Sequence, residues 1–129
     1  MKGKPFFFAY LWGGIIFVCC TVPSIGIEKV QKINKFFTLI LSDYSMHFFS
    51  FGIFALLLCY GFYKAEKITV PFFKIILYST GYGLFIELVQ IMLPYRFFGI
   101  NDLVSDFMGA VAALVLFKLI VINRRVSKV

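Results

Sequence analysis

Seven polar residues of this chain are of types that could do chemistry, and most of them lie in one segment. That segment, IELVQIMLPYRFFGINDLVSDFMG (residues 86–109), interrupts an otherwise apolar second half. The only histidine of the chain lies upstream of it. The seven candidates for a binding site are Asp43, His47, Glu87, Gln90, Arg96, Asp102 and Asp106.

Each of these side chains suits a particular kind of chemistry. His47 and Glu87 are candidate catalytic residues, because imidazole and carboxyl groups can exchange protons with a substrate. Asp102 and Asp106 are candidate metal ligands, since carboxylate oxygens favour Mg²⁺ and Ca²⁺. A guanidinium such as that of Arg96 can hold phosphate. We expect no cofactor, while leaving a divalent cation open.

The rest of the chain is too apolar for a soluble domain. Its 129 residues are 61% hydrophobic, and they come in long runs rather than in alternating faces. Each run approaches the roughly 20 residues that a helix needs to cross a bilayer. We therefore predict a single all-α integral membrane domain over residues 1–129, with four transmembrane helices at about residues 6–22, 44–63, 70–94 and 103–122.

The charges that flank these runs predict their orientation. By the positive-inside rule, the more basic set of ends is cytoplasmic. That set contains Lys2, Lys4, Lys64, Lys67, Arg124, Arg125 and Lys128. We expect a multi-pass membrane protein with both termini cytoplasmic. The net charge of +7 then reflects topology rather than nucleic-acid binding.

The first outer loop, residues 24–43, carries a helical pattern of its own. Val30, Ile33, Phe37 and Leu41 recur at helical spacing, with three lysines on other faces. Such a pattern favours a short amphipathic helix lying in the outer interface between the first two spans. This helix could cover a site beneath it.

Small residues and cysteines of the spans predict packing rather than chemistry. Gly52, Gly81, Gly83 and Gly109 mark places where helices can approach one another closely. The three cysteines also fall within spans and show neither a disulfide framework nor a metal spacing. We interpret them as packing residues.

The predicted orientation brings the polar residues to one level. Asp43 and His47 lie at the outer start of the second span, and Asp102 and Asp106 at the outer start of the fourth. At 1.5 Å per residue, Glu87 lies roughly 10 Å below the outer end of the third span. The similar depths predict one outward-facing polar site.

Carboxylates inside a membrane are costly, which favours a use for them. A carboxylate at mid-span costs roughly 2.5 to 3.5 kcal/mol on insertion scales. Glu87 and Asp106 therefore need water, a proton or a partner. Asp102 and Asp106 share one face of the fourth span and repel each other, and Arg96 is the internal candidate for a cation that relieves them. Structural roles also stay open. Asp43 (or Ser42) and Asp102 (or Asn101) occupy positions typical of helix N-caps.

The order and spacing of these residues resemble a known family. SDYSMHFFSFGIFAL (residues 42–56) followed by ELVQIMLPYRFFGINDLVSDFMGA (residues 87–110) resembles the VanZ-like family of bacterial membrane proteins. The matching positions are Asp43, His47, Phe48, Glu87, Gln90, Arg96, Asp102 and Gly109. Tyr44 stands where the family often has Lys, and Asp106 where it usually has Asn.

The resemblance implies a phenotype rather than a reaction. VanZ-like proteins are associated with low-level resistance to teicoplanin-type glycopeptides. The implied location is the bacterial cell membrane. The departure at Asp106 would make the polar site of this chain more acidic than usual for the family.

Three classes of function remain. The leading hypothesis is a binding protein whose outward polar pocket engages the headgroup of a membrane lipid or cell-wall lipid precursor, or a lipidated glycopeptide. The second is an enzyme acting on a lipid headgroup, with His47 and Glu87 as acid and base and a cation at Asp102 and Asp106. The chain has one histidine and no obvious activated nucleophile, which argues against the enzyme. The third is a small proton-coupled transporter.

Overall fold

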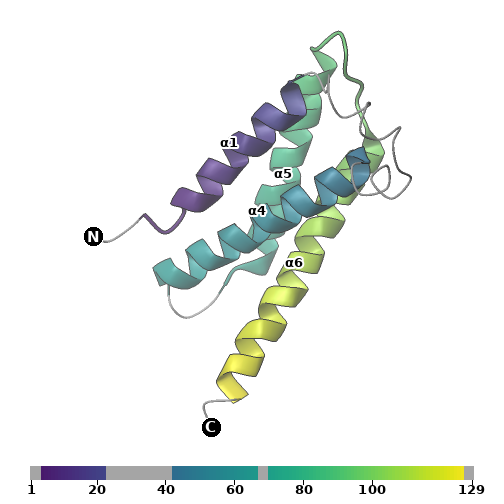
Figure 1. Cartoon of the computed structure of the whole chain (residues 1–129). Helices are drawn as coiled ribbons and strands as arrows, with labels where there is room; N and C mark the ends of the chain where they lie inside the picture. The colour runs from purple at the N-terminus through teal and green to yellow at the C-terminus, as the bar shows by residue number, and fades with distance from the viewer. Residues whose placement is uncertain (1–3, 23–41, 67–69, 127–129) are drawn as a thin grey trace, which may run out of the picture.

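A computed structural model describes residues 4–22, 42–66 and 70–126 (Figure 1). These residues form four helices, α1 (Phe7–Thr21), α4 (Asp43–Glu66), α5 (Phe72–Ile91) and α6 (Ile100–Val126). The predicted all-α fold is confirmed for this part of the chain. The amphipathic helix predicted in the first outer loop falls on residues that the structure does not describe, and it stays a prediction.

Three of the helices are long and apolar enough to cross a membrane. They comprise Asp43–Ala65, Phe72–Ile91 and Ile100–Val121. Helix α1 is also apolar, but it has 15 residues, against about 20 for a full crossing. The four predicted spans are therefore matched by three helices of sufficient length, and the first span stays a prediction.

The surface of the bundle supports a membrane environment. Large apolar side chains are exposed on every long helix, including Phe49 (60%), Leu77 (59%) and Leu119 (54%). In water, contiguous apolar surface of this kind promotes association. A helix that is hydrophobic all round is typical of a membrane span. The surface is consistent with an integral membrane protein.

The two helices that carry most of the polar residues begin differently. Ser42 caps α4, because its Oγ accepts the backbone N–H of Ser45 at 3.3 Å. Helix α6 begins at Ile100, and the Gly99 carbonyl accepts the N–H of Asp102 at 3.1 Å. The N-cap alternative for Asn101 or Asp102 is therefore wrong, since both lie inside the first turn.

Glycines bring α4 and α6 into close contact. A Cβ on Gly109 would overlap the backbone carbonyl oxygen of Phe48, and a Cβ on Gly52 would lie 3.3 Å from the Gly109 oxygen. Residues without a side chain let two helix backbones approach at such points. The starts of α4 and α6 consequently lie together, at the end of the bundle where α5 ends (Figure 1).

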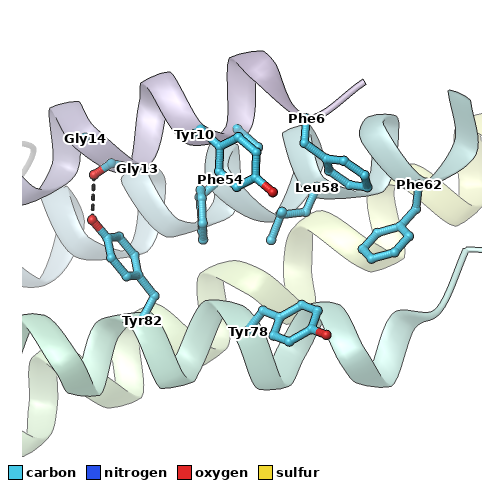
Figure 2. A pocket seen from close by; sticks show the side chains of 10 residues that line it. Phe6, Tyr10, Gly13, Gly14, Phe54, Leu58, Phe62, Tyr78 and Tyr82 are labelled. Carbon is cyan, nitrogen blue, oxygen red and sulfur yellow. Dashed lines mark hydrogen bonds between the residues drawn. The ribbon is translucent and has the colours of Figure 1, made fainter. Parts of the chain in front are cut away.

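Helix α1 is fastened across α4 and α5 by side chains that bind backbone carbonyls. The indole N–H of Trp12 donates to the Ser50 carbonyl at 2.9 Å. The Tyr82 hydroxyl donates to the Gly13 carbonyl at 2.8 Å, a bond drawn in Figure 2. These bonds fix α1 against the face of the bundle formed by α4 and α5.

Candidate functional site

Three helices contribute one titratable side chain each to a single point. One potential ligand atom of His47 (α4), one of Glu87 (α5) and one of Asp102 (α6) all lie within 4.8 Å of one another. His47 and Glu87 are buried, and Asp102 is half-buried. These three residues are called the acid–imidazole cluster below. They lie far apart in the sequence, and the meeting of three helix ends brings them together.

Asp106 supports the cluster through the histidine. Its Oδ1 lies 2.9 Å from Nδ1 of His47 in a fully buried position. Because an ionised carboxylate only accepts hydrogen bonds, Nδ1 carries the proton when Asp106 is charged. The ring Nε2 is then the nitrogen with a free lone pair. Asp106 therefore sets the tautomer and the orientation of the imidazole.

Glu87 is held by the connection that precedes α6. Its Oε2 accepts the backbone N–H of Gly99 at 2.7 Å. Gly99 directly precedes the first residue of α6, where the helix dipole favours negative charge. This bond and the nearby helix start help the membrane bundle to tolerate a glutamate with no exposed surface.

Several carboxylate oxygens have no hydrogen-bond partner among the residues that the structure describes. They are Oε1 of Glu87, Oδ1 of Asp102 and Oδ2 of Asp106. Burying a polar group without a partner is costly, and burying an unpaired charge costs more. The cluster therefore retains capacity to accept hydrogen bonds or to bind a cation.

Arg96 does not pair with Asp106 in the structure. The Arg96 guanidinium donates to the Val22 carbonyl at 3.5 Å. The guanidinium does interact electrostatically with Asp102. The partner of Asp106 is His47. Of the two carboxylates that Arg96 was expected to neutralise, only that of Asp102 interacts with it.

Gln90 and Tyr95 fasten the end of α1 instead of joining the cluster. The amide of Gln90 donates to the Cys20 carbonyl at 2.9 Å, and the Tyr95 hydroxyl donates to the Thr21 carbonyl at 2.9 Å. Asp43 is exposed, close enough to Asp102 for an electrostatic interaction. Of the seven predicted site residues, four therefore gather and three lie around them.

Two features of the site were not predicted. The Cys20 side chain of α1 approaches the His47 imidazole closely enough to interact with it. Gly83 of α5 provides the space for the Asp106 carboxylate, which a Cβ there would overlap. Gly83 was predicted as a point of close helix approach, but neither its place beside Asp106 nor the approach of Cys20 has a local sequence signal, because each depends on how one helix docks against another.

An apolar groove lies farther along the bundle, between α1, α4 and α5 (Figure 2). Its volume is about 560 Å³. The rings that line it are those of Phe6, Tyr10, Phe54, Phe62, Tyr78 and Tyr82. The remaining lining residues are Ala9, Gly13, Gly14 and Leu58.

Packed aromatic rings connect the groove with the cluster. The His47 imidazole lies parallel to the Phe51 ring, with centroids 6.1 Å apart. The Phe51 ring contacts that of Tyr82 at 6.3 Å, and Tyr82 lines the groove. The polar and apolar features thus belong to one continuous set of packed side chains.

Comparison with known proteins shows the family to which the chain belongs. The family model described as VanZ/LLP1 matches residues 27–121. All seven polar candidates lie inside the matched range. No curated protein and no solved structure shows a significant match to the chain. The family match covers most of the sequence and confirms the resemblance noted above, so the chain belongs to the VanZ/LLP1 family.

Proposed function

We propose that this protein binds the polar headgroup of a cell-envelope lipid, or of a lipidated glycopeptide, at the acid–imidazole cluster. Both ligands join an acyl chain to a polar group. Capture of either one at the membrane would give a route to the teicoplanin-type resistance that VanZ resemblance implies. The proposal does not require a chemical step.

The observation that carries the proposal is the convergence of His47, Glu87 and Asp102 within 4.8 Å. Ionisable side chains inside membrane spans are expensive and usually mark functional sites. Here three of them come from three helices and meet near one end of an apolar bundle. A binding site with a few convergent polar groups has this composition.

The groove supports an acyl-bearing ligand. Phe54, the groove residue nearest to His47 on α4, follows it by seven residues, or about 10 Å of helix. Half of a bilayer core is about 15 Å thick. The end of an acyl chain whose headgroup lies at the cluster would reach this depth. Phe51 and Tyr82 lie between groove and cluster, so the chain would pass over the bundle surface.

Charge limits which headgroups can bind directly. Three carboxylates gather at the site, and among the described residues the basic groups shown to interact with them are the His47 imidazole and the Arg96 guanidinium. The lysines of the first outer loop lie outside those residues. Direct binding therefore favours a headgroup with N–H or O–H donors, and an anionic headgroup needs an additional cation.

A binding measurement on the purified full-length protein in detergent tests the proposal. The probes are short-chain phosphatidylglycerol, teicoplanin and a glycopeptide without an acyl chain. We expect one of the first two to bind and the third to bind much more weakly. Glu87→Gln should weaken binding about tenfold, the loss expected for hydrogen bonds to a charged group.

The matched control is Glu66→Gln, the same change at the opposite end of α4. It lies about 28 Å of helix from His47 and should leave binding unchanged. Binding of phosphatidylglycerol identifies a lipid ligand, and binding of teicoplanin alone identifies the antibiotic. If neither probe binds, either alone or with a divalent cation added, or if both Glu variants bind equally well, the proposal is wrong.

The His47–Asp106 pair favours an acid–base enzyme as the second candidate. A buried carboxylate that orients an imidazole is the arrangement by which a histidine accepts and returns a proton during catalysis. Glu87 would serve as the second proton-transferring group. Mass spectrometry of phosphatidylglycerol after incubation with the protein would reveal headgroup cleavage. Unchanged lipid after prolonged incubation would contradict the enzyme and favour the binding protein.

A further inference from the structure

The acid–imidazole cluster has the donor set of a metal site. It offers one imidazole nitrogen and two carboxylate oxygens from three different helices, all within 4.8 Å of one another. Ligand atoms on a tetrahedral ion lie about 3.4 Å apart, since metal–N and metal–O distances are about 2.1 Å. The three groups therefore need to close by up to about 1.4 Å to hold one ion.

A second observation points to a ligand at this place. Glu87 has no exposed surface, and its Oε1 has no hydrogen-bond partner among the described residues. The other oxygen is already held by Gly99. A rigidly held carboxylate with one empty oxygen in an apolar bundle needs a cation or a proton, because an unpaired charge is costly there. The half-buried Asp102 presents a buried, unpartnered Oδ1 as well.

The surroundings orient these groups in the way that metal sites require. Metal-binding histidines usually donate their other ring N–H to a carboxylate, which fixes the tautomer and raises ligand basicity. Asp106 does this at Nδ1 of His47 with a distance of 2.9 Å. Nε2 then carries the lone pair that an ion needs, and the Cys20 side chain also interacts with this ring. The Gly99 N–H plays the corresponding part for Glu87.

We propose that His47, Glu87 and Asp102 bind one divalent transition-metal cation. A mixed imidazole and carboxylate set suits Zn²⁺ or Mn²⁺ better than Ca²⁺ or Mg²⁺, which prefer oxygen ligands alone. The ion would convert an acidic cluster into one that attracts anions. This second step rests on the proposed function, because it assigns the ion the role of holding an anionic headgroup.

Metal titration of the full-length protein tests the ion site directly. The protein is purified in detergent, treated with a chelator and dialysed. Zn²⁺ or Mn²⁺ is then added alone, with binding followed by calorimetry and by the electron paramagnetic resonance of Mn²⁺. We expect one ion per chain. Glu87→Gln and Asp102→Asn should each weaken binding by about tenfold or more, while Glu66→Gln should bind like the parent.

Each outcome of the titration decides the question. If the parent binds neither ion at concentrations up to about 1 mM, the range of the weakest protein Ca²⁺ sites, the ion site is wrong. It is also wrong if Glu87→Gln and Asp102→Asn bind as well as the parent. Should these variants fail to accumulate, His47→Gln serves instead, since it exchanges the metal-binding nitrogen for an amide.

Lipid binding measured with and without the metal separates the two proposals. If phosphatidylglycerol binds only when Zn²⁺ or Mn²⁺ is present, the ion holds the headgroup. If the metal binds but chelation leaves the lipid affinity unchanged, the ion site is supported and the proposal that the ion holds the headgroup is wrong. If lipid binds while the metal titration is negative, the proposed function stands and the ion site is wrong.

Discussion

Gly83 on α5 faces the carboxylate of Asp106 on α6 so closely that a Cβ on the glycine would overlap Oδ2. The same carboxylate holds Nδ1 of His47 through its other oxygen. The space left by the missing side chain is therefore part of the polar site. Gly83 positions the acid that orients the histidine.

Gly83→Ala should displace Asp106 and strain its bond to His47. Forcing an extra methyl group into a packed position typically costs about 1–3 kcal/mol. We expect a lower midpoint of thermal unfolding in detergent and weaker ligand or metal binding. Intrinsic fluorescence during heating gives the midpoint, and calorimetry gives the affinity.

Gly81→Ala is the matched control on the same helix. A Cβ at Gly81 has no heavy atom within 4 Å beyond its own surroundings. Because alanine favours helix more than glycine by up to about 1 kcal/mol, this variant should be no less stable than the parent. Equal effects of the two substitutions would contradict the role assigned to Gly83.

Gln90 offers a test of whether a predicted site residue binds ligand or fastens a helix. Its amide donates to the Cys20 carbonyl of α1, and its side chain is 3% exposed. Gln90→Leu keeps the bulk and removes the bond, so we expect a loss of stability of about 1 kcal/mol. Faster hydrogen–deuterium exchange in α1 would report the loosening.

Binding distinguishes the two roles of Gln90. If it only fastens α1, Gln90→Leu should bind Mn²⁺ or phosphatidylglycerol with nearly the parent affinity. Loss of binding in a variant whose unfolding midpoint is unchanged would instead place Gln90 among the ligand-contacting residues. Tyr82→Phe is the comparison variant, because it removes another hydrogen bond to α1, the one from the Tyr82 hydroxyl to the Gly13 carbonyl.

Periodicity and length predicted the apolar helices of the described residues and the level at which four of the seven polar candidates meet. Residues four apart share a helix face, and antiparallel spans bring the start of one beside the end of the next. His47, Glu87 and Asp102 could therefore be assigned to one level of the bundle. The bounds of α1 (Phe7–Thr21) also agree with the predicted run of residues 6–22, but its 15 residues leave its crossing of the membrane a prediction.

The pairing within the site depended on tertiary packing and could not be predicted. Which acid meets His47 is decided by how α6 rotates against α4, and the close backbone contact at Gly109 sets that rotation. The sequence pattern suggested Arg96 as the partner of the carboxylates because both are charged. The docked end of α1 instead offers the Val22 carbonyl to Arg96 and the Cys20 carbonyl to Gln90.

Orientation in the membrane stays a prediction that a reporter experiment can test. The positive-inside rule assigns both termini to the cytoplasm. A reporter active only in the cytoplasm should work when fused after Val129 and fail when inserted near Gly99. The reverse result would place the acid–imidazole cluster at the cytoplasmic face and remove the cell-wall ligands from consideration.

Asp106 provides the last prediction, because the VanZ-like pattern usually has Asn at this position. Asp106→Asn keeps an acceptor oxygen of nearly the same shape for Nδ1 of His47. We therefore expect nearly unchanged stability. Asp106→Leu removes the acceptor and leaves a buried imidazole N–H unpaired, at a cost of about 1–3 kcal/mol. Thermal unfolding of both variants in detergent measures this difference.

Affinity separates a supporting role of Asp106 from a direct one. If Asp106 only orients His47, Asp106→Asn should lower the affinity for Zn²⁺ or Mn²⁺ by roughly 10- to 100-fold at most. A loss of this size is typical when a residue that hydrogen-bonds to a metal ligand is replaced. If Asp106 itself ligates the ion or carries a proton, the amide should abolish binding or headgroup cleavage outright. We expect the first result, because the Asp106 carboxylate already holds the histidine and the pattern of the family tolerates an amide in its place. Complete loss of function in Asp106→Asn, with stability unchanged, would show that the added charge takes part directly and would favour the enzyme over the binding protein.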